Sequence, residues 1–149
     1  LFRSLSSTAK DLHRYTQMLL NDGVLNGVRI LSQESVQEMR KNQNPLALTP
    51  RGLGWEVKKP VSTLNKTSLE FSCGPNFPDN SCGHTGFTGT SLWFDPASKQ
   101  IIIALSNRVH LTREKNMDAM KKFRVKLHGL FNLNNTSRKK TNLNLTAVI

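Results

Sequence analysis

The sequence lacks a long apolar run, a complete set of metal ligands and a second tyrosine. No apolar run approaches the ~18 residues that cross a bilayer, since the longest, Ile101–Leu105, has the length of a strand. Its two cysteines, Cys73 and Cys82, make an incomplete zinc set even with His84 nearby, because no second ligand pair follows at the usual spacing. We therefore expect no transmembrane segment, no metal and no cofactor.

Acidic residues are also scarce. The chain has 21 Lys and Arg but 10 Asp and Glu, so its formal net charge is +11. Such a charge attracts anionic surfaces, for example wall polymers, membranes or nucleic acid. Basic residues crowd the segments 115–126 and 138–140, but no phosphate-binding loop or aromatic platform accompanies them. We expect a basic domain that is attracted to anionic surfaces and has no nucleic-acid partner.

The start of the chain carries no mark of a leader. It has neither an initiator methionine nor a charged start followed by an apolar core. We therefore expect any signal peptide to lie outside this sequence. The length suits one domain, or one lobe of a larger domain, with a modest core.

Hydrophobic spacing predicts helices in three places. Apolar residues recur every three or four positions over Ala9–Leu19, with a hydroxyl residue just before them as a cap and Asp22-Gly23 as a stop. Ser32 can cap a short helix that ends near Arg40. The apolar stripe from Met117 to Leu130 predicts a last helix lying across a sheet.

Alternating and β-branched stretches predict the strands. Gly52–Val57 alternates like a strand, with Trp55 inside it or lining a site. Two further strands near 84–94 and 100–106, joined by an Asp-Pro turn, should form an antiparallel hairpin, and Asn26-Gly27 predicts a separate small hairpin. The expected fold class is α/β of the α+β type, an antiparallel sheet lobe flanked by helices. We expect residues 1–131 to form this lobe and the Asn-, Thr- and Lys-rich residues 132–149 to be a disordered tail or linker.

The segment Gly83–Thr90 is the part of the chain best suited to hold a substrate. Three glycines interleave there with hydroxyls and one imidazole. Glycines remove side chains from the pleat and let a ligand or another backbone come close. The triplet His84-Thr85-Gly86 is expected to open a strand, with the geometry of an edge that pairs with something extended.

These residues resemble the carboxy-terminal part of the serine β-lactamase-like hydrolases, a superfamily of class C β-lactamases, penicillin-binding carboxypeptidases and related esterases. The likeness extends over Phe87–Ser91 and Ile101–Arg108 and, earlier, over Leu5–Leu12 and Leu25–Ser32. It covers roughly residues 1 to 130 in the expected order. The resemblance implies a β-lactamase/transpeptidase-like fold, incomplete in this chain, and an extracytoplasmic or secreted location.

The third motif of the family, Lys-Thr-Gly or a variant such as His-Thr-Gly, corresponds to the triplet at 84–86. The resemblance implies that His84 contributes electrostatics and hydrogen bonding near the nucleophile. It also implies that Thr85 binds the polar end of the substrate. Phe87, just after Gly86, would offer its backbone N–H as half of an oxyanion hole.

The nucleophile of the family has no convincing counterpart. The family uses the serine of a Ser-x-x-Lys motif, assisted by a Tyr-x-Asn tyrosine, and both lie well upstream of the triplet. The segments Ser7–Lys10 and Ser137–Lys140 match the first pattern, yet they lie where the family has something else, and Thr8 or Ser7 is better explained as a helix cap. Tyr15 is followed by Thr16-Gln17 and is expected to pack inside. We expect the nucleophile upstream of this chain, and the chain alone to be inactive.

Two functions follow. The first is the carboxy-terminal portion of a β-lactamase-related serine hydrolase that cleaves amide or ester bonds through an acyl-serine intermediate. The alternative is a non-catalytic binding or pseudoenzyme module with a basic interaction surface. Within the first, pocket shape and not the fold decides among β-lactam, D-alanyl peptide and ester substrates.

The cysteines and the other histidines leave further alternatives. Cys73 and Cys82 lie in the turn-rich loop before the triplet, where either a disulfide that braces the site or two free thiols is expected. His13 and His128 are interpreted as surface residues of their helices. His110 follows a strand near the expected rim of the site.

Overall fold

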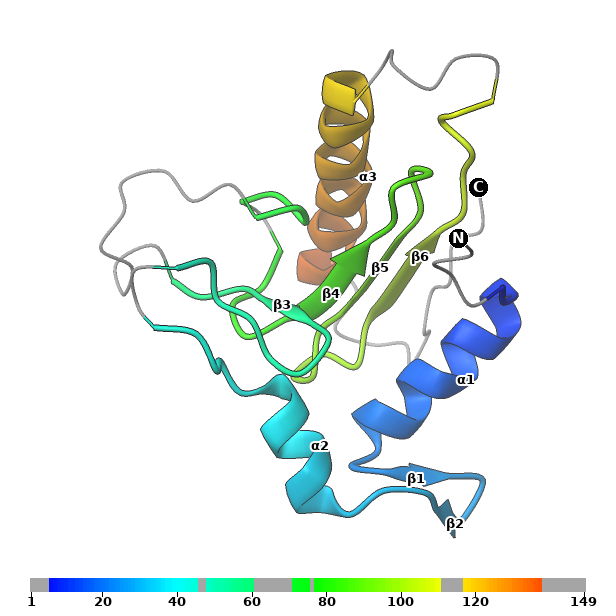
Figure 1. Cartoon of the computed structure of the whole chain (residues 1–149), viewed down its shortest axis with the longest axis vertical. Helices are drawn as coiled ribbons and strands as arrows, with labels where there is room; N and C mark the ends of the chain where they lie inside the picture. Colours follow the sequence, from blue (N-terminus) through cyan, green and yellow to red (C-terminus); the bar gives the residue numbers. More distant parts are fainter. Residues whose placement is uncertain (1–5, 46–47, 61–70, 76, 111–116, 138–149) are drawn as a thin grey trace.

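The fold is a four-stranded antiparallel sheet with helices on both faces (Figure 1). The computed structural model describes residues 6–45, 48–60, 71–75, 77–110 and 117–137, the last eight as backbone only. The helices in this part are α1 (Ala9–Leu20), α2 (Gln33–Arg40) and α3 (Met117–Ser137). The strands are β1 (Val24–Leu25), β2 (Val28–Arg29), β3 (Glu56–Val57), β4 (Cys82–Thr85), β5 (Ser91–Phe94) and β6 (Ile101–Ala104). The predicted mixed class, an antiparallel sheet flanked by helices, is confirmed.

Local capping explains the first two helices, which match their predictions closely. The Thr8 hydroxyl accepts the backbone N–H of Asp11 at 3.1 Å and starts α1. The Ser32 hydroxyl does the same for the N–H of Ser35 at 3.1 Å and starts α2. Between the helices, the β1–β2 hairpin turns at Asn26-Gly27, where both residues have positive φ, as a two-residue hairpin turn requires.

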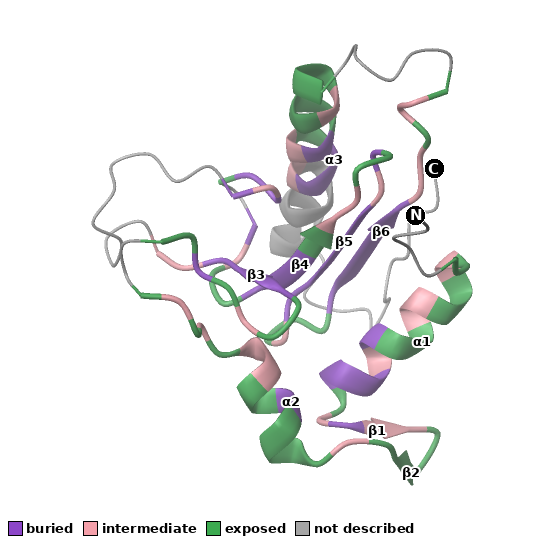
Figure 2. Ribbon diagram, viewed as in Figure 1, coloured by how far each residue is buried: buried purple, intermediate pink, exposed green. Residues whose placement is uncertain are grey.

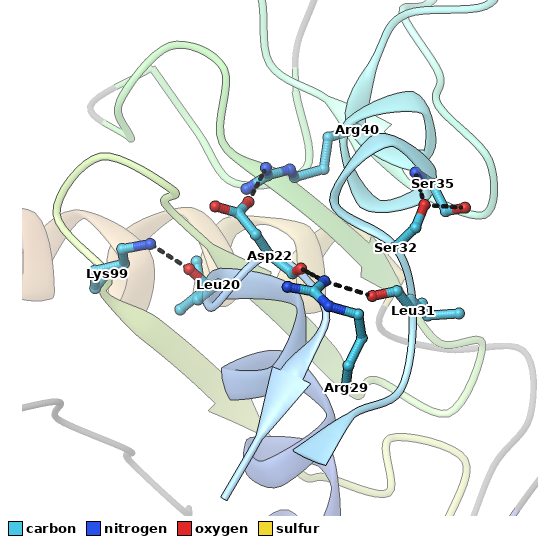
Figure 3. A network of polar contacts seen from close by, with 8 residues as sticks. All are labelled: Leu20, Asp22, Arg29, Leu31, Ser32, Ser35, Arg40 and Lys99. Atoms are coloured by element: carbon cyan, nitrogen blue, oxygen red, sulfur yellow. Dashed lines mark hydrogen bonds and ion pairs between the residues drawn. The ribbon is translucent and has the colours of Figure 1, made fainter. Parts of the chain in front are cut away.

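A polar network ties these elements to the sheet (Figure 3). The Arg40 guanidinium lies 3.1 Å from an Asp22 carboxylate oxygen, joining α2 to the end of α1. Arg29 of β2 donates to the Asp22 carbonyl at 3.1 Å, and Lys99 in the β5–β6 turn donates to the Leu20 carbonyl. Because these contacts converge on the C-terminal end of α1, they fix the helix against the hairpin, α2 and the sheet.

The sheet has the order β3-β4-β5-β6. The predicted hairpin of β5 and β6 is confirmed, with Leu92 opposite Ile103. The single predicted strand over 84–94 is wrong, because the chain reverses within 86–90 and forms two antiparallel strands. The predicted strand over 52–57 is reduced to β3, since Gly54 bends the chain with φ 82°.

Alternation along the strands divides the core between the two faces of the sheet. Leu92 and Phe94 of β5 face α1 and α2, where they pack with residues such as Leu19, Val36 and Trp55. Trp55 is buried, as predicted, with its ring edge-on to Phe94 at 5.2 Å. On the other face, under α3, Trp93 and Ile102 pack with the apolar residues of the segment before β4, namely Phe71, Cys73 and Phe77. Strands β5 and β6 are accordingly buried along their whole length (Figure 2).

The last helix covers the second face of the sheet as predicted, but not through the whole predicted stripe, since Met117 and Phe123 are exposed. Leu127 and His128 are buried there, and the His128 ring lies 6.0 Å from that of Phe77. The helix continues to Ser137 and so passes the predicted end of the lobe at 131, because asparagine and threonine lower helix propensity only slightly once a helix is under way. The polar tail predicted to start at 132 thus begins within this helix, and residues 138–149 lie outside the described part. None of the described helices is both long and apolar enough to cross a bilayer.

Candidate functional site

The triplet lies at the end of β4, beside an unpaired part of the sheet edge. Its expected place at the start of a strand is wrong, because His84 and Thr85 close β4 and pair with Leu92 and Ser91 of β5. On the other side, β3 pairs with β4 only at Cys82 and Gly83. In the described part of the chain, no strand therefore lies against the outer edge at 84–85. His84 is exposed and Thr85 is half-buried.

The direction of the backbone at Thr85 follows from the bonds around it. Gly86 donates its N–H to the Thr90 carbonyl at 2.7 Å, on the β5 side. The Ser81 carbonyl accepts the N–H of Lys58 at 2.9 Å, on the β3 side. Because the bonding direction alternates along a strand, odd-numbered residues of β4 point toward β3. The N–H and C=O of Thr85 therefore point to the open edge, where an extended chain can pair with them.

The turn after the triplet is tight and needs its glycines. Besides the bond between Gly86 and Thr90, the Gly89 N–H donates to the Gly86 carbonyl at 3.1 Å. Gly89 has φ 105°, which L side chains rarely adopt. A Cβ on Gly86 would lie 2.1 Å from the Thr90 hydroxyl oxygen. The glycines therefore serve chain reversal as well as access.

Phe87 lies in this turn and is held by the segment that follows β6. Its side chain is 57% exposed, and the Arg108 guanidinium carbon lies 4.5 Å from the centre of its ring. Arg108 also donates from Nε to the Phe87 carbonyl at 2.6 Å and from its backbone N–H to the Thr88 carbonyl at 2.8 Å. The two peptide units that follow Phe87 are thus anchored from outside the turn.

Arg124 of α3 is a site-proximal residue that the sequence did not single out. Its guanidinium donates to the carbonyls of Gly86, Gly89 and Thr90, so it binds both ends of the turn. In the sequence, Arg124 is not distinguished from the other basic residues of the predicted last helix. The signal that could have identified it is its spacing: it lies three residues before Leu127, on the buried face of the helix.

The expected surface position of His128 is wrong. The side chain is fully buried, with Nε2 3.3 Å from the Ser91 hydroxyl oxygen. Burial, and secondarily the Arg124 cation, lowers the pKa of His128 to about 4. The ring is therefore neutral near pH 7, and the Ser91–His128 pair lies inside the core rather than at the open edge.

The two cysteines are free thiols, so the disulfide is not formed. Cys82 packs on the α1 face of the sheet, whereas Cys73 packs on the α3 face. A bridge would have to pass through the sheet, which disulfide geometry does not allow without backbone movement. Burial raises the pKa of each thiol to about 12, so neither is a ready nucleophile.

The remaining candidates lie apart from reactive partners. Ser7 is exposed before the α1 cap, and its hydroxyl donates to the Thr8 carbonyl at 3.5 Å. Tyr15, expected to pack inside, is 40% exposed and stacks on Trp55 at 6.2 Å between ring centres. The Ser137 side chain is outside the described part. Within the described ranges, no group of three His, Cys, Asp or Glu side chains is arranged to hold a metal ion.

Comparison with known proteins agrees with the fold class. A family model described as "Beta-lactamase" matches residues 3–126, so the chain belongs to the beta-lactamase family, as the resemblance predicted. It is similar to the N-acetylmuramyl-L-alanine amidase of Bacillus subtilis, with 32% identity over 107 residues, 71% of this chain and 22% of the relative. It is also similar to a putative D-alanyl-D-alanine carboxypeptidase of Salmonella paratyphi B, with 29% identity over 106 residues, 71% of this chain and 23% of the relative. The chain thus spans less than a quarter of the length of these relatives, 22% and 23%.

Proposed function

We propose that this chain carries the substrate-binding strand of a serine hydrolase that cleaves amide or ester bonds of peptide-like substrates through an acyl-serine intermediate. The observation that carries the proposal is the open edge of β4, where the N–H and C=O of Thr85 face outward beside the exposed His84. Membership of the beta-lactamase family supports the reaction type. The names of the two relatives, an amidase and a putative carboxypeptidase, support an amide bond as the target.

The proposed roles follow the order of the chain. An extended substrate pairs with the Thr85 backbone as an added strand, which places its acyl carbonyl beyond the end of β4. The Phe87 N–H binds the carbonyl oxygen as it becomes an oxyanion, since a fixed donor is most valuable where charge develops only in the transition state. His84 lies beside this position and hydrogen-bonds there. Thr85 also offers its hydroxyl to the polar end of the substrate.

The nucleophile is proposed to lie in a part of the protein that precedes this chain. The family order of Ser-x-x-Lys, Tyr-x-Asn and then Lys/His-Thr-Gly supports this position, as does the 22–23% share of the relatives that the chain spans. The serine oxygen attacks the acyl carbon, the amine or alcohol leaves with a proton, and water then releases the acid. Residues 1–131 are proposed as the carboxy-terminal lobe of this catalytic domain.

Covalent labelling tests the proposal. The protein expressed from the complete reading frame is incubated with a fluorescent penicillin and a fluorescent fluorophosphonate, and adducts are located by intact mass and peptide mapping. We expect one labelled serine upstream of this chain. His84→Ala and Thr85→Ala should slow labelling by about 10- to 100-fold, because each removes a group placed at the reacting centre.

Controls separate the two candidate functions. This chain alone serves as the negative control, and label on it would return Ser7 to consideration. Exposed Lys41 offers a matched surface substitution, Lys41→Ala, that should leave the labelling rate unchanged. Absence of any adduct on the complete protein would contradict the hydrolase and favour the non-catalytic binding module.

A further inference from the structure

Arg124 is buried beneath the turn that follows the His-Thr-Gly triplet. Only 8% of the residue is exposed, although it lies on a helix with many surface lysines. Its Nη2 donates to the carbonyls of Gly86 at 2.8 Å and Thr90 at 3.1 Å, and its Nε donates to the carbonyl of Gly89 at 3.1 Å. A single side chain from α3 therefore binds three carbonyls of the β4–β5 turn.

The charge of Arg124 is balanced by these carbonyls. In the part of the chain that the structure describes, no carboxylate pairs with it, and the charged group that acts on it is another cation, Arg108. A guanidinium stays protonated even when it is desolvated. Burying a charged group costs free energy because the charge is removed from water. Leu127, one turn later on the same helix face, packs α3 on the sheet without that cost because it is apolar. The distinctive contribution of Arg124 is thus to hold the carbonyl groups of the turn.

The bond to the Gly86 carbonyl has a direct effect on Phe87. The C=O of Gly86 and the N–H of Phe87 belong to the same peptide unit, which is planar, so the two groups point in opposite directions. Fixing the carbonyl on Arg124 fixes the direction of the N–H on the other side of the unit. A cationic donor on the carbonyl also polarises the unit and makes its N–H a stronger donor.

We propose that Arg124 is a positioning residue that orients and polarises the Phe87 N–H for binding the oxyanion. The inference rests on the proposed hydrolase function and deepens it by assigning a role to α3. An oxyanion donor must be placed to within a fraction of an ångström, which a turn of small residues does not achieve alone. Arg124 supplies the restraint from a rigid helix, and Arg108 restrains the next carbonyl along.

The test compares variants of the complete protein. Arg124→Met removes the three bonds at similar size, and Arg124→Lys keeps the charge but not the fork that spans the carbonyls. Lys126→Met is the matched control, since Lys126 is exposed on the same helix. We expect Arg124→Met to slow acylation by the fluorescent penicillin about 10- to 100-fold with little change in KM. The acylation rate of Arg124→Lys should lie between those of Arg124→Met and the wild type. The rate of Lys126→Met should equal that of the wild type.

A second readout does not depend on activity. Hydrogen exchange of the Gly86 and Gly89 amides, which donate within the turn, should become faster in both Arg124 variants and stay unchanged in Lys126→Met. Unchanged exchange would overturn the inference, as would wild-type acylation rates in Arg124→Met. A wild-type protein that forms no adduct would contradict the proposed function and, with it, the catalytic part of the inference. Normal wild-type labelling with an unaffected Arg124→Met variant would contradict the inference alone.

Discussion

At the scale of single residues, burial changes the chemistry of side chains that look ordinary in the sequence. His128, Arg124 and the two cysteines are all removed from water, and each consequently differs from an exposed residue of its kind. The imidazole is neutral, the guanidinium is bound by carbonyls, and the thiols are unreactive. Each of these states depends mainly on burial by segments that are distant in the sequence.

The pKa of His128 makes stability depend on pH. The folded pKa is about 4, below the value of 6.5 for an unperturbed histidine, so the unfolded state binds the proton more readily. The contribution of the neutral His128 ring to the free energy of unfolding is fully present above pH ~6.5. It is lost as the pH falls toward ~4, and the total loss is on the order of 3 kcal/mol. NMR titration of the His128 ring in the complete protein should give the low pKa. His128→Gln should remove this part of the acid destabilisation, and a ring that titrates near 6.5 would contradict the burial argument.

Position 83 requires glycine because there is no room for a side chain, and not because of its backbone conformation. A Cβ there would lie 2.1 Å from the Trp93 ring, which is buried and cannot move aside. We expect Gly83→Ala to lower the free energy of unfolding by about 1–3 kcal/mol. The control is Gly27→Asn, where φ is 80° but nothing lies within 4 Å of the added Cβ. Asparagine tolerates that conformation, so thermal melts should show a clearly smaller loss for the control.

At the scale of elements, contacts at element ends determine how the helices meet the sheet. The C-terminal end of α1 is held by Arg40, Arg29 and Lys99, which come from three different elements. The edge of β4 that faces β3, by contrast, has no strand partner at residues 84–85 in the described part. Contacts therefore brace one end of the sheet, whereas among the described residues no strand covers the edge near the triplet.

The pair of Asp22 and Arg40 should couple α1 to α2. The Arg40 side chain is 16% exposed and that of Asp22 is 42% exposed, so the pair is partly screened. A double-mutant cycle with Asp22→Asn and Arg40→Met should give a coupling free energy of about 0.5–1 kcal/mol. The exposed pair of Glu38 and Lys41, at 3.5 Å, is the control and should give a smaller coupling. Equal values for the two cycles would contradict a special role for the network.

At the scale of the whole molecule, the sheet separates two apolar cores. α1 and α2 close one core and α3 closes the other, and Cys82 and Cys73 lie in different cores. The same separation places Arg124 on the α3 side of the turn. Long-range packing thus decides both the state of the cysteines and the support of the candidate site.

The free thiols give a prediction at this scale. Intact mass of the unreduced protein should lack the deficit of about 2 Da that a disulfide produces. A maleimide should modify Cys73 and Cys82 only after denaturation, because both are buried and the pKa of each is about 12. The denatured protein is the positive control. Rapid modification of the folded protein, or the mass deficit, would contradict the arrangement of the two cores.

Features that depend on near neighbours were predictable from the amino-acid sequence. Caps at Thr8 and Ser32 and the turn at Asn26-Gly27 each rest on bonds within a few residues, so their positions were predicted well. The family was likewise predicted from the sequence, because motif residues and their order can be recognised without knowledge of contacts.

Features that depend on distant partners could be seen only in the folded chain. The break between β4 and β5 was missed because the glycines of this segment were interpreted as positions of close approach, and the reversal is stabilised by Arg124, which lies 38 positions after Gly86. The burial of His128 and the separation of the cysteines were missed for the same reason. Periodicity specifies which residues share a face, but not which other segment covers that face, and the chemistry at the end of β4 depends on that covering.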